Sequence, residues 1–371
     1  MTVPRWFEPL LSYCIESKAS DIHLTADEAV FLRVHGELSP VPDTAHCARA
    51  VSHEEMNDVV QSLSNTQQRD VLNDSGSLDM GYSLGTERFR INIYRYLHRY
   101  SMAIRHIDDQ ALSFEQLKLP PQVRQLAELR SGLILVTGAT GSGKSTTLAA
   151  CIRHINEHRR CHILTVEDPI EFMHSNVKSL IHQRELYTDV PDFATAVKAS
   201  LREDPDVIMV GEMRDQDTMR AAITAAETGH LVLSTMHTVD TPGTIERLIG
   251  SFPAAEQDVI RGRIALSLQG VIAQRLLPNL QGGARVPAVE ILLVNHAIRH
   301  LIENGKTRQI YAALESGTRD GMQTIDQALA LLVSNKLVAY DQARPHCRDP
   351  KMFDELIRSR GRAQNLGGMS S

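Results

Sequence analysis

The residues best suited to chemistry form one glycine-rich segment near the middle of the chain. Residues 138–145 read Gly-Ala-Thr-Gly-Ser-Gly-Lys-Ser, after the apolar run Leu133–Val136 and before the helix-like residues 146–150. In such a strand–loop–helix unit, glycines let backbone N–H groups close around phosphates, the lysine reaches the terminal phosphates and the serine hydroxyl can ligate Mg²⁺. An ordinary glycine-rich turn would lack both flanking elements. The sequence therefore predicts a site for ATP and Mg²⁺ made by Gly138, Ala139, Thr140, Gly141, Ser142, Gly143, Lys144, Ser145 and Thr146.

Two acidic side chains follow the next predicted strands. Strand 162–166 leads into Glu167, and strand 207–210 leads into Gly211 and Glu212. Ligands of open α/β sheets bind at the carboxyl ends of strands, and phosphoryl transfer needs carboxylates that hold magnesium or its waters and orient the attacking water. We therefore expect Glu167 and Glu212 to be catalytic, with Ser145 as a magnesium ligand and Glu212 contacting the metal through water. The alternative is a pair of solvated acids at strand ends.

Two histidines bracket the predicted strand 231–235. His230 precedes it and His237 follows it closely, so each is expected near a strand end rather than in an apolar core. Either could sense phosphate or contact a neighbouring subunit. The alternative, a histidine satisfied by local backbone, is equally compatible with the pattern.

Zinc-capable residues follow the glycine-rich segment. Cys151, His154 and His158 have the spacing i, i+3 and i+7 of one helix face, and Cys161 and His162 come next. No pair among them has the spacing of a structural zinc site. We therefore favour a helix surface that carries histidines and a small buried cysteine.

Composition weighs against several functional classes. The 371 residues carry a formal net charge of −6 without a basic block, which argues against nucleic-acid binding. No apolar run approaches the roughly 18 residues of a membrane span, and the N-terminus lacks the apolar stretch of a signal peptide. Any membrane contact is expected to be peripheral. Five scattered cysteines fit a reducing cytoplasm better than a disulfide framework.

The pattern along the chain predicts two folded domains. Residues 1–112 read as an α+β domain, with a helix near 9–17, a polar helical stretch over 52–72 and strands at 20–24, 31–35, 88–94 and 101–107. Prolines mark a linker at 113–122. From 123 to 345, strands alternate with helices and then give way to helices alone, which is typical of an α/β core with a parallel sheet. The tail, 346–371, is expected to be mobile.

Four segments in order resemble the Walker A, Asp box, Walker B and His box of the type II/IV secretion ATPase superfamily. These segments are residues 138–146, 164–172, 201–215 and 228–238. Within the superfamily the sequence is most similar to PilT-type (PilT/PilU) retraction ATPases of type IV pili, through residues 20–24, 88–92 and 297–303. The resemblance covers about residues 10–345.

The resemblance implies a homohexameric motor. An N-terminal PAS-like domain would close over nucleotide held by a RecA-like P-loop NTPase domain with C-terminal helices, and arginines of the first domain would reach phosphate. Arg90 and Arg105 fall on such positions. Arg99 is the nearest candidate for the third, because the family's Asn-Arg-Gly loop is replaced here by residues 97–100. Glu167, Glu212, His230 and His237 carry over as the box residues. From pattern alone, the arginines could equally lie on an exposed sheet face.

The resemblance also implies a role. The leading hypothesis is a cytoplasmic ATPase, peripheral to the inner membrane, that docks on a pilus platform protein and drives pilus retraction and twitching, with a second retraction ATPase as a potential partner. A second hypothesis is a pilus-assembly or type II secretion ATPase. Such ATPases usually carry a four-cysteine zinc element, and this chain has no cysteine from 162 to 346, which favours retraction. A third hypothesis is a PilU-like accessory subunit that binds nucleotide without turnover.

Overall fold

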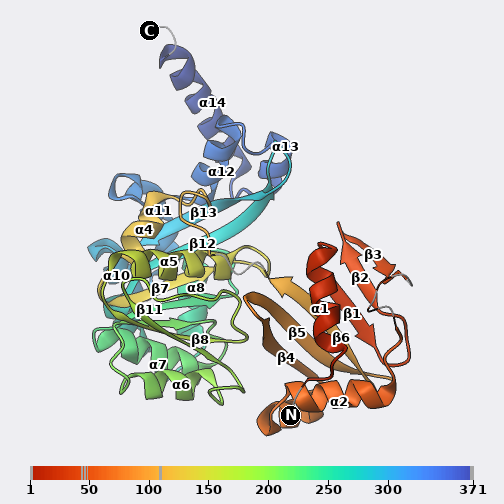
Figure 1. Ribbon diagram of the computed structural model, residues 1–371. Coiled ribbons are helices and arrows are strands. Elements are labelled where there is room, and N and C mark those ends of the chain that lie inside the picture. Colours follow the sequence, from red (N-terminus) through yellow and green to blue (C-terminus); the bar gives the residue numbers. More distant parts are fainter. Residues whose placement is uncertain (1–2, 43–44, 46, 48, 108–110, 368–371) are drawn as a thin grey trace. The chain divides into compact units, whose positions relative to one another are not determined.

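The computed structural model describes residues 3–42, 45, 47, 49–107 and 111–367, which form two compact units (Figure 1). The first unit contains residues up to 110 together with 166–174 and 183–192. The second contains 111–165, 175–182 and the rest of the chain from 193. The units are defined by contacts and not by independent folding, so the domain boundaries expected from the sequence stay predictions.

The first unit is an antiparallel sheet with a helical layer. Its strands lie in the order β3-β2-β1-β6-β5-β4 and every neighbouring pair is antiparallel. Alternate residues of β5, Phe89, Ile91 and Ile93, are fully buried with Phe7 and Leu11 of α1, as period-2 alternation requires. The elements are α1 (Phe7–Glu16), β1 (Asp21–Thr25), β2 (Phe31–Val34), β3 (Glu37–Pro40), α2 (His53–Leu63), α3 (Thr66–Ser75), β4 (Ser77–Leu84), β5 (Glu87–Tyr96) and β6 (Arg99–Ile107).

The polar helical stretch predicted over 52–72 is two helices instead of one. Ser52 and Asn65 each start a helix with a capping box, in which the cap side chain accepts the N–H of Glu55 or Gln68 and that residue bonds back to the cap. Such reciprocal bonds satisfy two amides that a helix start leaves unpaired. Asn65 therefore begins α3 and ends any continuation of α2.

A tight turn joins β5 to β6. Leu97 and His98 occupy the turn with φ of 46° and 64°, the left-handed conformation that two-residue hairpin turns demand. The resulting register places Arg90 opposite Arg105 and Tyr96 opposite Arg99. Of residues 97–100, which replace the family's Asn-Arg-Gly loop, only Leu97 and His98 form the turn, and Arg99 begins β6.

A buried ion pair attaches the two later segments to this sheet. Arg88 Nη2 lies 2.7 Å from Glu185 Oε2, and the side chains are 10% and 7% exposed. The Glu185 carboxylate also accepts the N–H groups of Gly81 at 3.0 Å and Ile170 at 3.2 Å. Each charge is thus satisfied by a partner, which is the condition for burying it.

The second unit is built mainly on a seven-stranded sheet in the order β13-β12-β7-β11-β10-β8-β9. β7 pairs in parallel with both β11 and β12, β11 pairs in parallel with β10, and β13 is antiparallel to β12. The strands are β7 (Gly132–Thr137), β8 (His162–Glu167), β9 (Leu180–Glu185), β10 (Val207–Val210), β11 (Leu231–Met236), β12 (Leu268–Pro278) and β13 (Arg285–Leu293).

Helices cover both faces of this sheet. Leu133 and Leu135 of β7 pack in one core with α7 and α9, and Ile134 and Val136 pack in the other with α4 and α5. Burial on both faces explains why β7 reads as a continuous apolar run. The helices are α4 (Pro121–Ala127), α5 (Lys144–His158), α6 (Phe193–Ser200), α7 (Gln216–Glu227), α8 (Thr241–Gly250), α9 (Gln257–Ser267), α10 (His296–Glu303), α11 (Ile310–Ser316), α12 (Ile325–Ser334), α13 (Tyr340–Ala343) and α14 (Pro350–Gly367).

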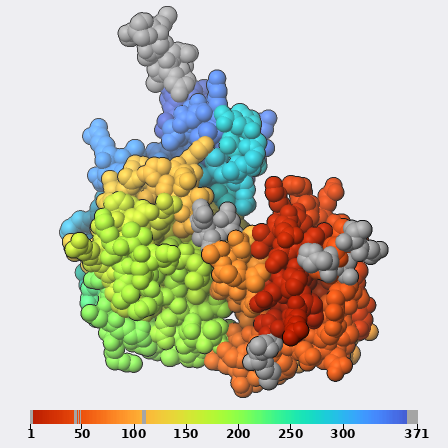
Figure 2. All heavy atoms as spheres, viewed as in Figure 1, coloured from red at the N-terminus to blue at the C-terminus, as the bar shows by residue number. Residues whose placement is uncertain are grey.

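The segment after Pro345 contains α14, although the sequence led us to expect mobility there. Phe353 is fully buried in a small core that also contains Leu277 and Val286 of the β12–β13 hairpin and Leu329 of α12. In the space-filling view, the blue C-terminal residues lie directly beside the cyan hairpin (Figure 2). The first turns of α14 are therefore packed structure.

We expect the Gly81→Ala variant to be destabilised by about 1–3 kcal/mol, because a Cβ at Gly81 would overlap the Arg88 guanidinium and come within 2.7 Å of Glu185 Oε2. Thermal unfolding of the purified protein measures the change. Gly250→Ala is the control, since a Cβ there meets nothing within 4 Å. Equal unfolding temperatures for the two variants would contradict a tightly packed ion pair.

Candidate active site

The glycine-rich segment forms the loop between β7 and α5, which we call the phosphate loop (residues 138–145). Gly138, Gly141 and Gly143 have φ of 146°, 77° and 88°, and α5 begins at Lys144. A Cβ at Gly138 would lie 2.5 Å from Ser142 Oγ, and one at Gly143 would lie 2.8 Å from Gln274 Nε2. The glycines are thus required by backbone conformation and by close packing.

Polar groups of this loop fit the phosphates of a nucleotide and a magnesium ion. The Lys144 ammonium is held over the loop, where it donates to the carbonyls of Gly138 at 3.0 Å and Ala139 at 3.1 Å. The buried Ser142 hydroxyl has no hydrogen-bond partner among the described residues, and Ser145 is exposed. Amides at a helix N-terminus, an ammonium and hydroxyls are the donor set that binds phosphate, and a serine oxygen suits magnesium.

Gln274 of β12 supports the phosphate loop and was missed by sequence reasoning. Its Nε2 donates to the Ser142 carbonyl at 2.8 Å and its Oε1 accepts from Thr147 Oγ1 at 2.7 Å, with only 4% of the residue exposed. The signal was a glutamine after the apolar residues 271–273 of a buried strand. Because the buried amide uses both its donor and its acceptor, it holds the Ser142 carbonyl and the Thr147 hydroxyl in place.

Glu212 follows β10 and meets His237, which follows β11. Glu212 Oε2 lies 3.2 Å from His237 Nε2, and Oε1 lies 2.6 Å from Arg214 Nη2. The Glu212 side chain is 13% exposed, whereas that of Arg214 is 72% exposed. Because β10, β11 and β7 are parallel, their carboxyl ends share one edge of the sheet. The structure therefore brings Glu212 and His237 to the edge that carries the phosphate loop.

Backbone and side-chain contacts hold the turn that carries Glu212. Thr235 Oγ1 donates to the Gly211 carbonyl at 2.6 Å, and Met213 N donates to the Thr235 carbonyl at 3.0 Å. Asp215 then caps α7 by accepting the Thr218 N–H at 2.8 Å. Burial alone would raise the pKa of Asp215, but the hydrogen bonds from Thr218 outweigh it and lower that pKa. The cap therefore stays ionised at neutral pH.

His230 lies at the other end of β11 from His237. Its Nδ1 is 2.9 Å from the Ala225 carbonyl and 3.1 Å from Thr228 Oγ1. The six residues of β11 separate the two histidines by about 20 Å. His230 is thus not brought to the Glu212 edge, and a role for it, including contact with a neighbouring subunit, stays a prediction.

Glu167 is the last residue of β8 and belongs to the first compact unit. It is 8% exposed, and its Oε1 accepts from Gln183 Nε2 at 3.1 Å. Gln183 also donates to the Phe172 carbonyl at 2.8 Å and so ties the segment together. The structure gives Glu167 a defined position, while its catalytic role stays a prediction.

The three candidate arginines do not converge on one point of their sheet. Arg90 contacts Asp79 at 3.2 Å and Glu171 at 3.3 Å. Arg105 lies directly opposite Arg90 on β6 and contacts Asp21 at 2.8 Å, with 68% of its side chain exposed. Arg99, with Asp27 at 3.4 Å, lies six residues from Arg105 on the same face of β6, or about 20 Å along the strand. Arg90 and Arg105 form the adjacent pair.

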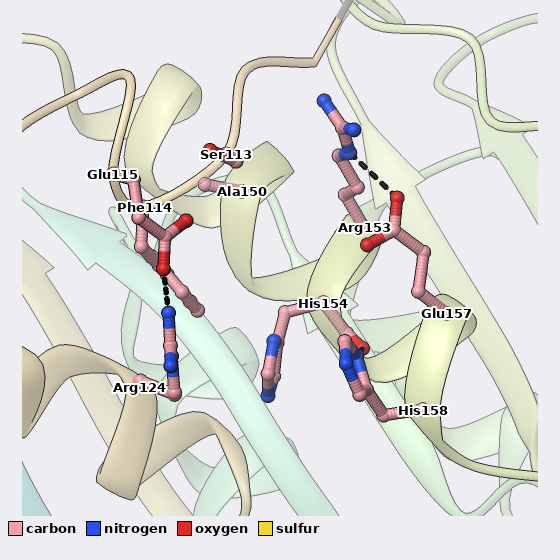
Figure 3. Close-up of a pocket in the computed structure, with 9 residues that line it drawn as sticks. All are labelled: Ser113, Phe114, Glu115, Arg124, Ala150, Arg153, His154, Glu157 and His158. Carbon is pink, nitrogen blue, oxygen red and sulfur yellow. Dashed lines mark hydrogen bonds and ion pairs between the residues drawn. The ribbon is translucent and has the colours of Figure 1, made fainter.

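A hollow of about 180 Å³ lies beside α5 and is lined by His154 and His158, which were considered as zinc ligands. Figure 3 shows His154 and His158 side by side, with Arg124 joined to Glu115 and Arg153 joined to Glu157; the two imidazole rings are stacked 4.2 Å apart. Cys151 instead lies in the core, where burial raises its pKa to about 12. Within the described ranges, no three His, Cys, Asp or Glu side chains are placed to hold a metal.

Taken with the fold, this site defines a P-loop ATPase with a RecA-like core. A family model described as "Type II/IV secretion system protein" matches residues 1–327. The chain belongs to that family. Among the described residues, no helix is both long and apolar enough to cross a membrane.

Individual relatives agree over most of the chain. A twitching motility protein of Neisseria gonorrhoeae is 45% identical over 316 residues, which cover 84% of this chain and 83% of that protein. The type IV pilus retraction ATPase PilT of Pseudomonas aeruginosa is 39% identical over 345 residues, 93% and 98% of the two chains. A crystal structure of the pilus retraction motor PilT with bound ADP matches with a TM-score of 0.83 at 40% identity, over 94% of this chain and 98% of that one.

These findings confirm the predicted fold class, an N-terminal α+β domain followed by a RecA-like ATPase domain. They also confirm the resemblance to PilT-type ATPases and the expectation that the chain is a nucleotide-binding ATPase. The individual roles of the site residues are not tested by them.

The Gln274→Leu variant is expected to weaken nucleotide binding about 5- to 30-fold, because it leaves the Ser142 carbonyl and the Thr147 hydroxyl without their partner. Titration with a fluorescent ADP analogue measures the affinity. Gln281→Leu, in the exposed turn after β12, is the control. Wild-type affinity in the Gln274 variant, with unchanged stability, would show that the loop does not depend on this amide.

Proposed function

We propose that this protein is a homohexameric motor that hydrolyses ATP to drive type IV pilus retraction and twitching motility. The observation that carries the proposal is the contact between Glu212 and His237 at the sheet edge that bears the phosphate loop. The near full-length similarity to a retraction ATPase and to a twitching motility protein supports the direction of the work.

Each site residue except His230 has a proposed task. The phosphate loop and Lys144 bind the phosphates, and Ser145 together with Glu212, through water, would hold Mg²⁺, which neutralises phosphate charge when bound. Glu212 orients the attacking water, and His237 with Arg214 fixes the Glu212 carboxylate. Glu167 supplies a second carboxylate. Phosphoryl transfer depends on such positioning and on charge stabilisation.

Arginines of the first unit are proposed to stabilise charge on the transferred phosphoryl group. Arg90 and Arg105 are adjacent on one face of the sheet, so they can act together. Closure of the N-terminal domain over nucleotide would bring the two arginines to the phosphate, and hydrolysis would let the domain open again. Rigid-body rotation of this type converts a local phosphate change into motion.

The proposed setting is the cytoplasmic face of the inner membrane, with a pilus platform protein as the docking partner and a second retraction ATPase as a potential partner.

Two observations weigh against the alternative functions. The chain has no cysteine between residues 162 and 346, so a four-cysteine zinc element of the assembly and export type has no ligands there. Lys144, Glu167 and Glu212 are all present, which favours a working ATPase over a PilU-like subunit without turnover.

Replacing Glu212 with Gln is expected to lower the ATP turnover rate about 100-fold or more while nucleotide binding persists, since the amide keeps the size of the side chain but cannot accept a proton. Phosphate release and fluorescent-ADP titration measure the two properties. In cells of the source organism the variant should give excess pili and no twitching. Glu54→Gln, on the exposed side of α2, is the matched control.

Loss of pili in the Glu212→Gln cells would instead mean that the motor drives assembly. Normal pili and normal twitching would contradict a pilus motor. Absence of turnover in both the wild type and the variant would favour the accessory role.

Among the arginines, Arg90→Gln and Arg105→Gln should each lower kcat about 100-fold with little change in KM, and Arg99→Gln should lower it less, because the register separates Arg99 from the pair. Steady-state ATP hydrolysis tests all three. Arg95→Gln is the control, because five residues along β5 place Arg95 on the opposite face from Arg90. A larger effect at Arg99 than at Arg90 would reverse the assignment.

A further inference from the structure

We propose that Arg348, in the segment just before α14, is a positioning residue for ATP hydrolysis. It links the C-terminal segment to the loop between β11 and α8 (residues 237–240), which begins with His237. The inference rests on the proposed function of Glu212 and His237. All the contacts that carry it lie within the second compact unit.

The backbone around Arg348 is anchored by a buried carboxylate. Asp326 of α12 is 2% exposed and accepts the N–H groups of Arg348 at 2.7 Å and Asp349 at 3.0 Å. The following helix is held by Phe353, which is fully buried and stacks on Tyr340 with ring centroids 5.7 Å apart. Arg348 therefore projects from a fixed backbone.

The Arg348 side chain spans from the C-terminal segment to the β11–α8 loop. Its guanidinium lies 3.6 Å from the centre of the Tyr311 ring, close enough for a cation–π contact. Its Nη1 lies 3.5 Å from Asp240 Oδ2. Asp240 Oδ1 meanwhile accepts the Gly243 N–H at 2.7 Å and caps α8. The Asp240 carboxylate thus both pairs with Arg348 and caps α8.

From Asp240, hydrogen bonds continue to the phosphate loop. Thr244 Oγ1 donates to the Asp240 carbonyl at 2.7 Å and contacts Thr238 Oγ1 at 2.7 Å. Thr137 Oγ1, in the last residue before Gly138, donates to the Thr238 carbonyl at 2.7 Å, while the Thr238 N–H bonds to Thr137 Oγ1 at 3.0 Å. The C-terminal segment is therefore connected by contiguous contacts to both His237 and the phosphate loop.

The weakness of the ion pair between Arg348 and Asp240 indicates that it positions the loop rather than stabilises the fold. The Arg348 and Asp240 side chains are 45% and 31% exposed, and partly exposed ion pairs contribute little to folding. The rate of catalysis is more sensitive to position than stability is, because a displacement of a catalytic carboxylate by about 1 Å can lower the rate 100-fold. Losing Arg348 should therefore affect turnover more than unfolding.

The variants Arg348→Gln, Asp240→Asn and the double replacement test the link. Asparagine keeps the α8 cap, because its side-chain oxygen still accepts the Gly243 N–H, and removes only the charge. In the full-length protein we expect each single change to lower kcat about 3- to 10-fold with KM within twofold. The double variant should be no worse than the poorer single one, since contacting residues are not additive. Lys351→Gln, an exposed neighbour on α14, is the control.

Amide hydrogen exchange supplies a readout that does not need activity. The N–H groups of Thr238, in this loop, and of Thr241, at the start of α8, both donate hydrogen bonds. Their exchange should be faster in Arg348→Gln and Asp240→Asn, while that of α7 stays as in the wild type. If the fall in activity came only from global destabilisation, amide exchange would be faster throughout the protein, including α7.

Unchanged kcat in both single variants, additive losses in the double variant, or unchanged exchange at Thr238 and Thr241 would each overturn the proposal. Failure of the proposed function is distinguishable from these outcomes. It would show as absent turnover in the wild type or as full turnover in Glu212→Gln, whereas the exchange measurement still decides whether Arg348 holds the loop.

Discussion

The hydrogen bonds between Thr137 and Thr238 are the interaction on which the catalytic edge depends. Thr137 ends β7, and Thr238 follows His237 after β11, so these bonds join the strand that bears the phosphate loop to the strand that bears His237. They lie where the two parallel strands diverge into loops and ladder bonding ends. Without side-chain bonds there, the phosphate loop and the loop that begins with His237 could move separately.

A second constraint is the close packing of β12 against the phosphate loop. Gln274 lies against both Ser142 and Gly143, and the carbonyl of the same residue lies against Gly138. The loop is therefore shaped from outside by β12 as much as by its own glycines. Preorganised donors of this kind need little rearrangement when phosphate arrives, and this is the origin of their effect on charged groups.

Local patterns in the sequence were enough to predict the phosphate loop, the strands that precede it and follow it, and Glu212. Each is a short segment in which the residue types and their spacing indicate the local structure. Gln274 and Thr137 could not be predicted, because their partners lie 132 and 101 residues away along the chain. The sequence places His230 and His237 correctly at the two ends of one strand, but it does not tell which of them lies at the edge with the phosphate loop. The break between α2 and α3 was readable from Asn65 and Gln68, which form a capping box within four residues.

The Arg88–Glu185 ion pair has a consequence for how the protein can be divided. Because it holds residues 166–174 and 183–192 in the first unit, the backbone passes between the two units five times, after residues 110, 165, 174, 182 and 192. A fragment that begins just before the phosphate loop would carry Glu185 without Arg88, leaving a carboxylate without its buried cation. Any cut of the chain between residues 88 and 185 therefore divides the first unit itself and separates the two buried charges.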